Sequence, residues 1–276
     1  MNVSGEYRRP FRLGTALVFA ATCLLASDAW ATKSYYIDEM TNYQNGTSCD
    51  IATVNTITSS LQTQLNSDGW SGSRYTEYSA WPQDFWESCS TTYGTDGDDS
   101  IFGDNHVLTV FAGHGNSHLL AFSNTGNGGT YGGSKTCLTN LTNNSRLGDM
   151  SGAQAGFGMW LACDVIQSSE LGTNMYQSLR QQAGWQNTIS IGDDEPLDFY
   201  NATGSQTNAN AWLNQMSSGG RNAIIATFSS NNVTDCWSVH NSAQLKNDVY
   251  NSARNNGATC GGGQPAYYYC YQWRSN

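Results

Sequence analysis

The sequence predicts an α/β protein with three layers, in which a mostly parallel sheet is covered by helices on both faces. Segments rich in β-branched and aromatic residues alternate along the chain with segments whose apolar residues recur at helical spacing. Two of the strand-like segments, 107–112 and 157–162, are apolar over almost their whole length, as is typical of strands buried on both faces. This alternation around buried central strands favours one layered domain.

The first predicted elements follow one another closely. Residues 34–37, Ser-Tyr-Tyr-Ile, favour a strand. A helix is predicted over 51–65, where apolar residues recur every three or four positions. They are Ile51, Val54, Ile57, Leu61 and Leu65. Residues 74–78 form a further candidate strand.

The later elements are predicted from the same two periodicities. We expect, in order, a strand at 107–112, a short edge strand at 119–122, a strand at 157–162, a helix at 165–182, a strand at 188–191, a helix at 209–216, a strand at 222–228 and a helix at 241–255. The glycine-rich stretch 124–134 lacks the Lys-Ser or Lys-Thr ending of a phosphate-binding loop, so we expect an ordinary loop there.

The first 31 residues have the composition of a secretory signal. Three arginines precede the apolar stretch 13–26, and Ala29-Trp30-Ala31 supplies the small residues expected before a cleavage point. Two adjacent arginines near the start also partly resemble a twin-arginine export signal, so the export route stays open. We expect residues 1–31 to be removed, leaving a single domain at 32–276 that is secreted, to the periplasm or outside the cell.

The charge balance bounds the class of partner. The leader holds three of the 12 Lys and Arg residues and two of the 22 Asp and Glu residues, so the mature chain keeps nine basic and twenty acidic residues, a net charge of −11. Binding to nucleic-acid phosphates requires Lys and Arg, so we expect no nucleic-acid partner. Beyond the leader no stretch approaches about 18 uninterrupted apolar residues, so we expect no membrane partner after signal removal.

An odd number of cysteines remains once the signal is removed. Of the 8 Cys residues Cys23 lies in the leader, which leaves seven. In an oxidising compartment we expect six of them to pair and one to remain a free thiol. If Cys163 is the free one, the disulfide candidates are Cys49, Cys89, Cys137, Cys236, Cys260 and Cys270. Their connectivity stays open, although Cys260 and Cys270 are close enough in sequence to close a local loop.

Two of the apolar strands end in reactive side chains. His114 follows the strand at 107–112, and Cys163 directly follows the strand at 157–162. Strand ends border the binding crevice of an open α/β sheet, so we expect the two residues to share one crevice. A thiolate is a strong nucleophile, and a nearby imidazole can hold it ionised or protonate a leaving group. The pair predicts acyl transfer, with Cys163 as nucleophile and His114 as acid and base.

The same two segments supply donors for the oxyanion of a tetrahedral intermediate. Gly115 has no side chain, so a substrate carbonyl can approach its N–H closely. The backbone N–H of Cys163 is the natural second donor. We therefore expect an oxyanion hole formed by Gly115 and Cys163.

These residues resemble the caspase-like cysteine peptidases, which include caspases, legumains, gingipains and clostripain. The shared pattern is an apolar strand followed by His114-Gly115, and a later apolar strand followed by Ala162-Cys163. The resemblance implies a caspase-like fold and endopeptidase activity on peptide or protein substrates, with no cofactor and no metal. Leu161 and Val165 stand where caspases have Gln and Gly, and Leu161 also replaces the pocket-forming Asp of metacaspases, so specificity for basic side chains is not implied by that route.

A second resemblance is to secreted bacterial proteins of unknown function. They combine a Gly-His-Gly strand end, an Ala-Cys strand end and a later Ala-Trp-Leu helix, which stand here at 113–115, 162–163 and 211–213. This resemblance implies that the nearest relatives are themselves uncharacterised.

An acidic turn follows the strand expected at 188–191. Asp193 and Asp194 would lie at a strand end there, where they could border the crevice and attract a cationic group of the substrate. A solvated turn without a binding role is the competing interpretation.

Two other functions remain open beside the cysteine hydrolase. His106, His114 and His118 are metal-compatible residues around one strand, which would suit a metal-dependent hydrolase. Alternatively, the chain is a secreted binding module without turnover, with aromatic surfaces such as 267–269 contacting glycans or proteins.

Overall fold

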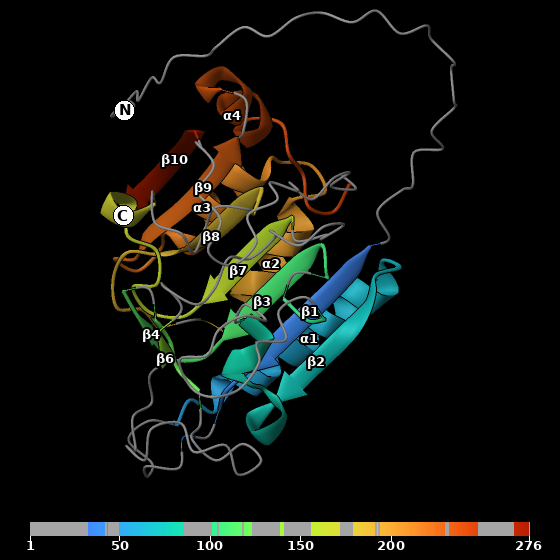
Figure 1. Cartoon of the computed structure of the whole chain (residues 1–276). Coiled ribbons are helices and arrows are strands. Elements are labelled where there is room, and N and C mark those ends of the chain that lie inside the picture. The colour runs from blue at the N-terminus through green and yellow to red at the C-terminus, as the bar shows by residue number, and fades with distance from the viewer. Residues whose placement is uncertain are drawn as a thin grey trace, which may run out of the picture.

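The fold is built on one seven-stranded sheet with α-helices packed against it (Figure 1). The computed structural model describes residues 33–41, 43, 50–85, 101–103, 105–117, 119–122, 139–140, 156–171, 179–190, 192, 194–229, 232–247 and 268–275. The strands of the large sheet are β1 (Ser34–Glu39), β2 (Ser71–Thr76), β3 (Leu108–Ala112), β7 (Phe157–Leu161), β8 (Gln181–Trp185), β9 (Asn222–Ser229) and β10 (Tyr268–Ser275).

The strand order across the sheet is β10-β9-β8-β7-β3-β1-β2. β2, β1, β3, β7 and β8 are parallel, whereas β9 is antiparallel to β8 and β10 is antiparallel to β9. The predicted α/β class with a mostly parallel sheet is therefore confirmed. A separate small sheet contains β4 (Gly115–Asn116), β5 (Leu119–Leu120) and β6 (Thr139–Asn140), so the predicted short strand at 119–122 belongs to this second sheet.

The helices that the structure describes lie on one face of the large sheet. They are α1 (Thr53–Ser67), α2 (Glu195–Ala202), α3 (Asn208–Met216) and α4 (Val233–His240). Leu61 of α1, Phe199 of α2 and Trp212 of α3 are fully buried in one core with Ile37 of β1 and Ile225 of β9. In Figure 1 the first three helices lie behind the strands. The apolar face of each helix thus buries the corresponding face of the sheet.

The opposite face of the sheet has a second core without an α-helix among the described residues. Tyr36 of β1, Phe111 of β3 and Trp160 of β7 are buried there with Phe85 from the 3₁₀ turn Pro82–Phe85 and Val165 from the segment after β7. Helices were predicted on both faces of the sheet. Within the residues that the structure describes, α-helices cover one face only.

Three predicted elements are wrong where the structure describes them. Of the helix expected at 165–182, the described residues 165–171 and 179–182 form coil, a 3₁₀ turn at Ser168–Glu170 and the start of β8, and residues 172–178 lie outside the described part. The described residues 188–190 of the strand expected at 188–191 form coil. The strand in this region is β8, earlier in the sequence. Of the helix expected at 241–255, the described residues 241–247 form turns and coil, and residues 248–255 lie outside the described part. The helix that the structure describes nearby is α4, earlier in the sequence, whose N-cap Asn232 accepts a hydrogen bond from the Asp235 N–H.

The predicted signal at 1–31 lies outside the described residues. Within the part of the chain that the structure describes, no helix has the length and apolar character needed to cross a membrane.

A buried polar cluster joins β1 to the 3₁₀ turn Pro82–Phe85. The hydroxyl oxygen of Tyr36 lies 2.6 Å from Oδ1 of Asp38 and 2.5 Å from Oδ2 of Asp84, and all three side chains are buried. One hydroxyl proton serves only one of these contacts, so the other carboxyl must carry a proton and donate it. Burial raises the pKa of Asp38 well above its usual range, and the charge of Asp84 raises it further. The cluster is therefore built around one shared proton.

This raised pKa predicts a fold that loses stability as the pH rises. The native state holds the Asp38 proton more tightly than the unfolded chain does, so its contribution is full below the unfolded pKa of 3.8 and is lost as the pH rises through the native pKa. In Asp38→Asn an amide N–H replaces the carboxyl proton. We expect this variant to be more stable than the wild type at pH 8 by about 1–3 kcal/mol and similar to it at pH 4.

Urea unfolding at several pH values between 4 and 8 measures this difference, with the exposed Asp194→Asn as a matched control. Parallel stability curves for the wild type and Asp38→Asn would contradict the shared proton.

Candidate functional site

The predicted dyad lies at the ends of two neighbouring parallel strands. β3 pairs directly with β7, and the register places Ala112 opposite Leu161. His114 and Cys163 each follow two residues later, so they leave the sheet at the same level. Neighbouring strands are about 4.8 Å apart, so this register brings the two strand ends into one region. Both residues are half-buried.

Tyr43 holds the strand end that carries His114. Its hydroxyl accepts a hydrogen bond from the backbone N–H of His114 at 2.8 Å and donates one to the carbonyl of Ala121 at 3.1 Å. The rings of Tyr43 and His114 lie with their centroids 5.0 Å apart. Tyr43 itself is buried. The turn at His114 is therefore fixed by a side chain 71 positions away, a contact that no local sequence signal indicates.

Gly115 is packed directly against the Cys163 segment. A Cβ at this position would lie 2.6 Å from Cγ2 of Val165, 2.8 Å from Cβ of Ala162 and 3.0 Å from the carbonyl oxygen of Cys163. Only glycine permits this approach of the two strand ends. The glycine of the His-Gly motif therefore has a structural reason as well as its predicted chemical one.

The ladder of the small sheet leaves the Gly115 N–H directed away from β5. Ala121 donates its N–H to the carbonyl of His114 at 3.0 Å, and Gly115 stands opposite Leu120. Directly opposed residues in an antiparallel pair alternate between exchanging hydrogen bonds and not exchanging them. The Gly115 and Leu120 pair is of the second kind. The N–H predicted to bind the oxyanion is thus not used by the β4–β5 ladder.

The sulfur of Cys163 lies against the backbone of Ile189. The Ile189 N–H donates to Sγ at 3.4 Å, and Sγ lies 3.6 Å from the Ile189 carbonyl oxygen. Asp164, the next residue, has a φ of 55° and donates its N–H to the carbonyl of Asn187 at 3.1 Å. A non-glycine residue in this region is uncommon, and such conformations cluster at functional sites. Segment 187–189 therefore forms a third wall of the candidate site.

Cys163 is a free thiol, as the odd cysteine count allows. Cys236 pairs with Cys270, across a Cα–Cα distance of 6.0 Å, so the suggested loop between Cys260 and Cys270 is wrong. The other disulfide candidates, Cys49, Cys89, Cys137 and Cys260, lie outside the described residues.

The acidic turn is only partly described. Asp193 lies outside the described residues, while Asp194 is exposed and precedes α2. The neighbouring Glu195 forms a bidentate ion pair with Arg221. Burial raises the pKa of Glu195, but its contacts with Arg221 outweigh burial and lower the pKa overall. Of the two carboxylates predicted to border the crevice, the structure therefore describes only Asp194. Asp194 lies five positions after Ile189, whose backbone contacts the thiol of Cys163.

The histidines proposed as metal ligands are separated by a strand. His106 precedes β3 and His114 follows it, so five strand residues, about 16 Å at 3.3 Å each, lie between them. Nδ1 of His106 lies 2.7 Å from the carbonyl of Phe102, and its ring packs against Tyr36. Metal–nitrogen bonds are about 2.0–2.1 Å long, so His106 and His114 do not share one ion. His118 lies outside the described residues, and no three metal-binding side chains cluster within the described part.

Fold and site together define an α/β protein with an imidazole and a free thiol at adjacent strand ends. A protein-family model described as "Domain of unknown function (DUF6345)" matches residues 37–247. The chain therefore belongs to this family. The match includes His114, Cys163 and Ile189 and ends before β10. No curated protein matches the chain.

The close approach at Gly115 gives a prediction for stability. In Gly115→Ala the new methyl group overlaps Val165 and Ala162, so we expect a loss of about 1–3 kcal/mol in the free energy of unfolding. Gly192→Ala is the matched control, because its methyl group meets only the flexible side chain of Glu195, at 3.2 Å or more. Urea unfolding of both variants measures the difference. Equal stabilities would show that the two strand ends are not packed together as described.

Proposed function

We propose that this protein is a secreted cysteine-dependent hydrolase, and specifically an endopeptidase, in which Cys163 is the nucleophile and His114 the acid and base. The observation that carries the proposal is the β3–β7 register, which ends both strands at the same level with a histidine on one and a free cysteine on the other. A nucleophile and a base on neighbouring rigid elements form the minimal arrangement for acyl transfer. The resemblance to caspase-like peptidases supports the same assignment.

In the proposed mechanism His114 removes the thiol proton, and the sulfur of Cys163 attacks the carbonyl carbon of the scissile peptide bond. The N–H groups of Gly115 and Cys163 stabilise the negative charge that develops on the carbonyl oxygen. His114 then donates its proton to the leaving amine, which leaves a thioester on Cys163. Water, deprotonated by His114, hydrolyses the thioester and releases the free thiol and a carboxylic acid.

Three observations support this mechanism beyond the dyad. Tyr43 fixes the backbone at His114, so the imidazole starts from a defined position. The β4–β5 ladder leaves the Gly115 N–H directed elsewhere. The Ile189 N–H lies 3.4 Å from Sγ, where it can stabilise negative charge on the sulfur until a substrate displaces it.

Substitution of the nucleophile tests the proposal. We expect Cys163→Ala to reduce cleavage of a mixed peptide library by about a thousand-fold or more, because the remaining groups bind but do not attack. Cys163→Ser is the matched control, since it keeps a polar atom near Ile189 but is a much weaker nucleophile in this setting. Mass spectrometry of the cleavage products gives the rates. Undiminished cleavage by Cys163→Ala would exclude this mechanism.

The acidic turn gives a test of specificity. If Asp193 and Asp194 border the substrate cleft, the double variant Asp193→Lys/Asp194→Lys lowers kcat/KM for peptides with Arg or Lys at the cleavage site more than for neutral peptides. Steady-state kinetics on a matched pair of peptides measures the ratio. An unchanged ratio would assign these carboxylates to a solvated turn.

A secreted binding module without turnover is the second candidate, and one observation favours it. The sulfur of Cys163 already contacts both backbone polar groups of Ile189, which is an arrangement that also suits an inert thiol. A protein that binds peptides or glycans with Cys163 unreactive would support this function in place of the hydrolase.

A further inference from the structure

β10 is an edge strand whose outer side has no neighbour among the described residues. It pairs with β9 over eight consecutive residues, from Tyr268 opposite Ser229 to Ser275 opposite Asn222, without a bulge. The strand contains no proline, no lysine and no acidic residue. Natural edge strands are commonly protected from pairing by such features, so β10 is unusually open to another strand.

The backbone groups that face this free edge follow from the pairing on the other side of β9. Phe228 donates its N–H to the carbonyl of Arg180, so the even-numbered residues of β9 point toward β8. Its odd-numbered residues therefore point toward β10, where Thr227 stands opposite Cys270. The even-numbered residues of β10 hydrogen-bond to β9. The N–H and C=O groups of Tyr269, Tyr271 and Trp273 are directed outward.

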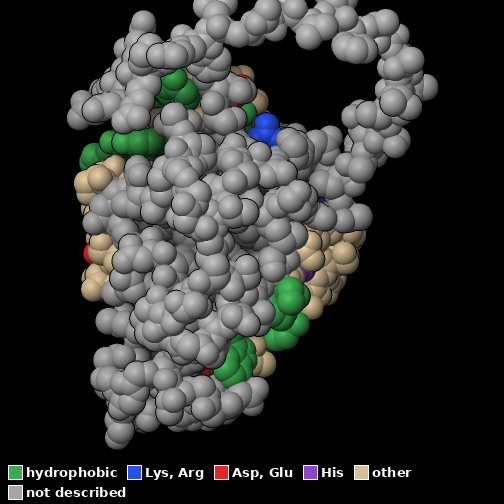
Figure 2. Space-filling view, viewed as in Figure 1, with side chains coloured by type: hydrophobic (Ala, Val, Ile, Leu, Met, Phe, Trp, Pro, Cys, Tyr) green, Lys and Arg blue, Asp and Glu red, His purple; other side chains and the backbone are tan. Residues whose placement is uncertain are grey.

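The same three residues form an aromatic row on one face of the strand. Tyr269, Tyr271 and Trp273 are spaced by two, so their side chains lie on the same side of the sheet. Tyr269 is 39% exposed and Trp273 is 53% exposed, and together with Ile101 they are the exposed large hydrophobic residues of the described chain. In Figure 2 hydrophobic side chains reach the surface where Figure 1 places β10.

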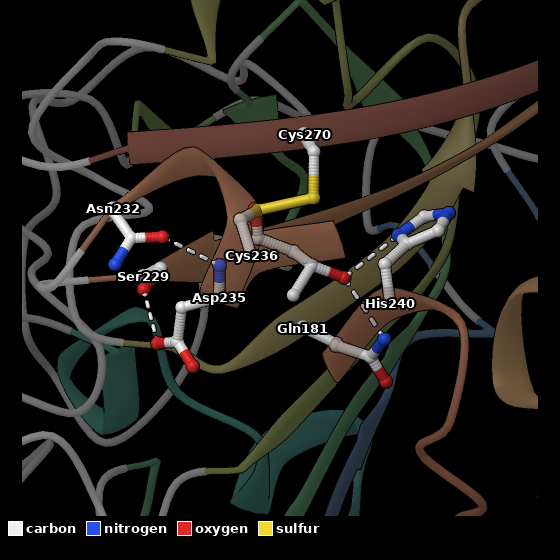
Figure 3. Close-up of a disulfide and its surroundings, with 8 residues drawn as sticks. Gln181, Ser229, Asn232, Asp235, Cys236, His240 and Cys270 are labelled. Carbon is white, nitrogen blue, oxygen red and sulfur yellow. Dashed lines mark hydrogen bonds between the residues drawn. A yellow bond between two sulfur atoms is a disulfide. The ribbon is translucent and has the colours of Figure 1, made fainter. Parts of the chain in front are cut away.

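The strand is held in place before any partner binds. The Cys236–Cys270 disulfide fastens it to α4, as Figure 3 shows. Arg274 donates hydrogen bonds to the carbonyl of Leu213 and, at 2.6 Å, to Oδ1 of Asn214, both on α3. A fixed strand loses little conformational freedom when it pairs, which favours association.

We propose that β10 pairs antiparallel with β10 of a second copy of this chain, centred on Tyr271. The two-fold axis then places Tyr271 opposite itself and Tyr269 opposite the partner's Trp273. By symmetry Trp273 also lies opposite the partner's Tyr269, which makes three residue pairs with outward-facing backbone groups. Each pair exchanges two hydrogen bonds, about six in all. The two seven-stranded sheets become one continuous sheet with an isologous interface.

The composition of the strand favours a second copy over a different partner. On the aromatic face, each copy supplies Tyr269 for the other's Trp273, and aromatic cross-strand pairs stabilise antiparallel strands. On the other face Arg274 lies opposite the aromatic ring of the partner's Tyr268, which is uncharged. Arg274 is the single charged residue of β10, so this register brings no like charges together although the chain has a net charge of −10.

Sedimentation equilibrium of the disulfide-intact protein tests the proposal. A single strand pair buries little surface, so we expect a dimer with a Kd in the micromolar range, roughly 1–100 μM. Tyr269→Lys/Trp273→Lys introduces charges at exposed positions of the edge, and we expect it to remain monomeric and folded at these concentrations. Ile101→Lys is the matched control, because Ile101 is 57% exposed but lies outside β10, and it should still dimerise.

A monomeric wild type throughout this range, or a double variant that dimerises as well as the wild type, would overturn the proposal. Loss of the dimer in Ile101→Lys would overturn it as well, because the interface would then lie elsewhere.

Cross-linking tests the register. In a Cys163→Ala background, Tyr269→Cys and Trp273→Cys are mixed and oxidised. Opposed residues of a hydrogen-bonded antiparallel pair have Cα atoms about 5.5 Å apart, within disulfide reach. We expect the mixture to form an interchain disulfide and each variant alone to form far less. Equal cross-linking of a single variant would overturn the register. Because this background lacks the candidate nucleophile, the result is independent of the proposed hydrolase.

Discussion

The parallel pairing of β3 with β7 is the constraint on which the candidate site depends. Ala112 opposite Leu161 fixes where both strands leave the sheet, so a histidine and a cysteine that are 49 positions apart reach the same edge. Both strands are buried on their two faces. On one face Met159 of β7 packs in the core that contains Ile37, and on the other face Phe111 of β3 and Trp160 of β7 pack in the second core. Because both faces are apolar, a shift of one residue would not expose them, but it would exchange the residues that fill the two cores, such as Met159 and Trp160. The packing of these side chains fixes the register and, through it, the site.

The residues beyond the strands turn this register into a defined local geometry. Gly115 allows the two strand ends to touch, Tyr43 anchors the backbone of His114, and the Ile189 backbone surrounds the sulfur of Cys163. These three contacts come from segments that are distant in sequence.

The sequence predicted those parts of the fold in which one physical signal dominates. Apolar runs identified β3, β7 and β9, and helical periodicity identified α1 and α3, because burial of one face sets the pattern. β8 was missed because its buried Gln181 and Gln182 are polar. Gln181 donates to the hydroxyl of Thr227, and the side-chain oxygen of Gln182 accepts from Nε1 of Trp160, contacts that exist only in the folded chain. The placement of His114 and Cys163 at neighbouring strand ends was predictable from the apolar runs, whereas the contacts of Tyr43 and Ile189 were not, since neither belongs to a motif.

Reactivity of Cys163 in the intact protein tests the central claim most directly. The non-reduced protein is treated with a thiol alkylator at a series of pH values, and the modified residue is identified by mass spectrometry in the wild type and in His114→Ala. A functional dyad predicts rapid labelling at Cys163 near neutral pH, slowed by about tenfold or more in His114→Ala because the imidazole no longer accepts the thiol proton. An unlabelled Cys163, or equal rates in the two proteins, would contradict the dyad.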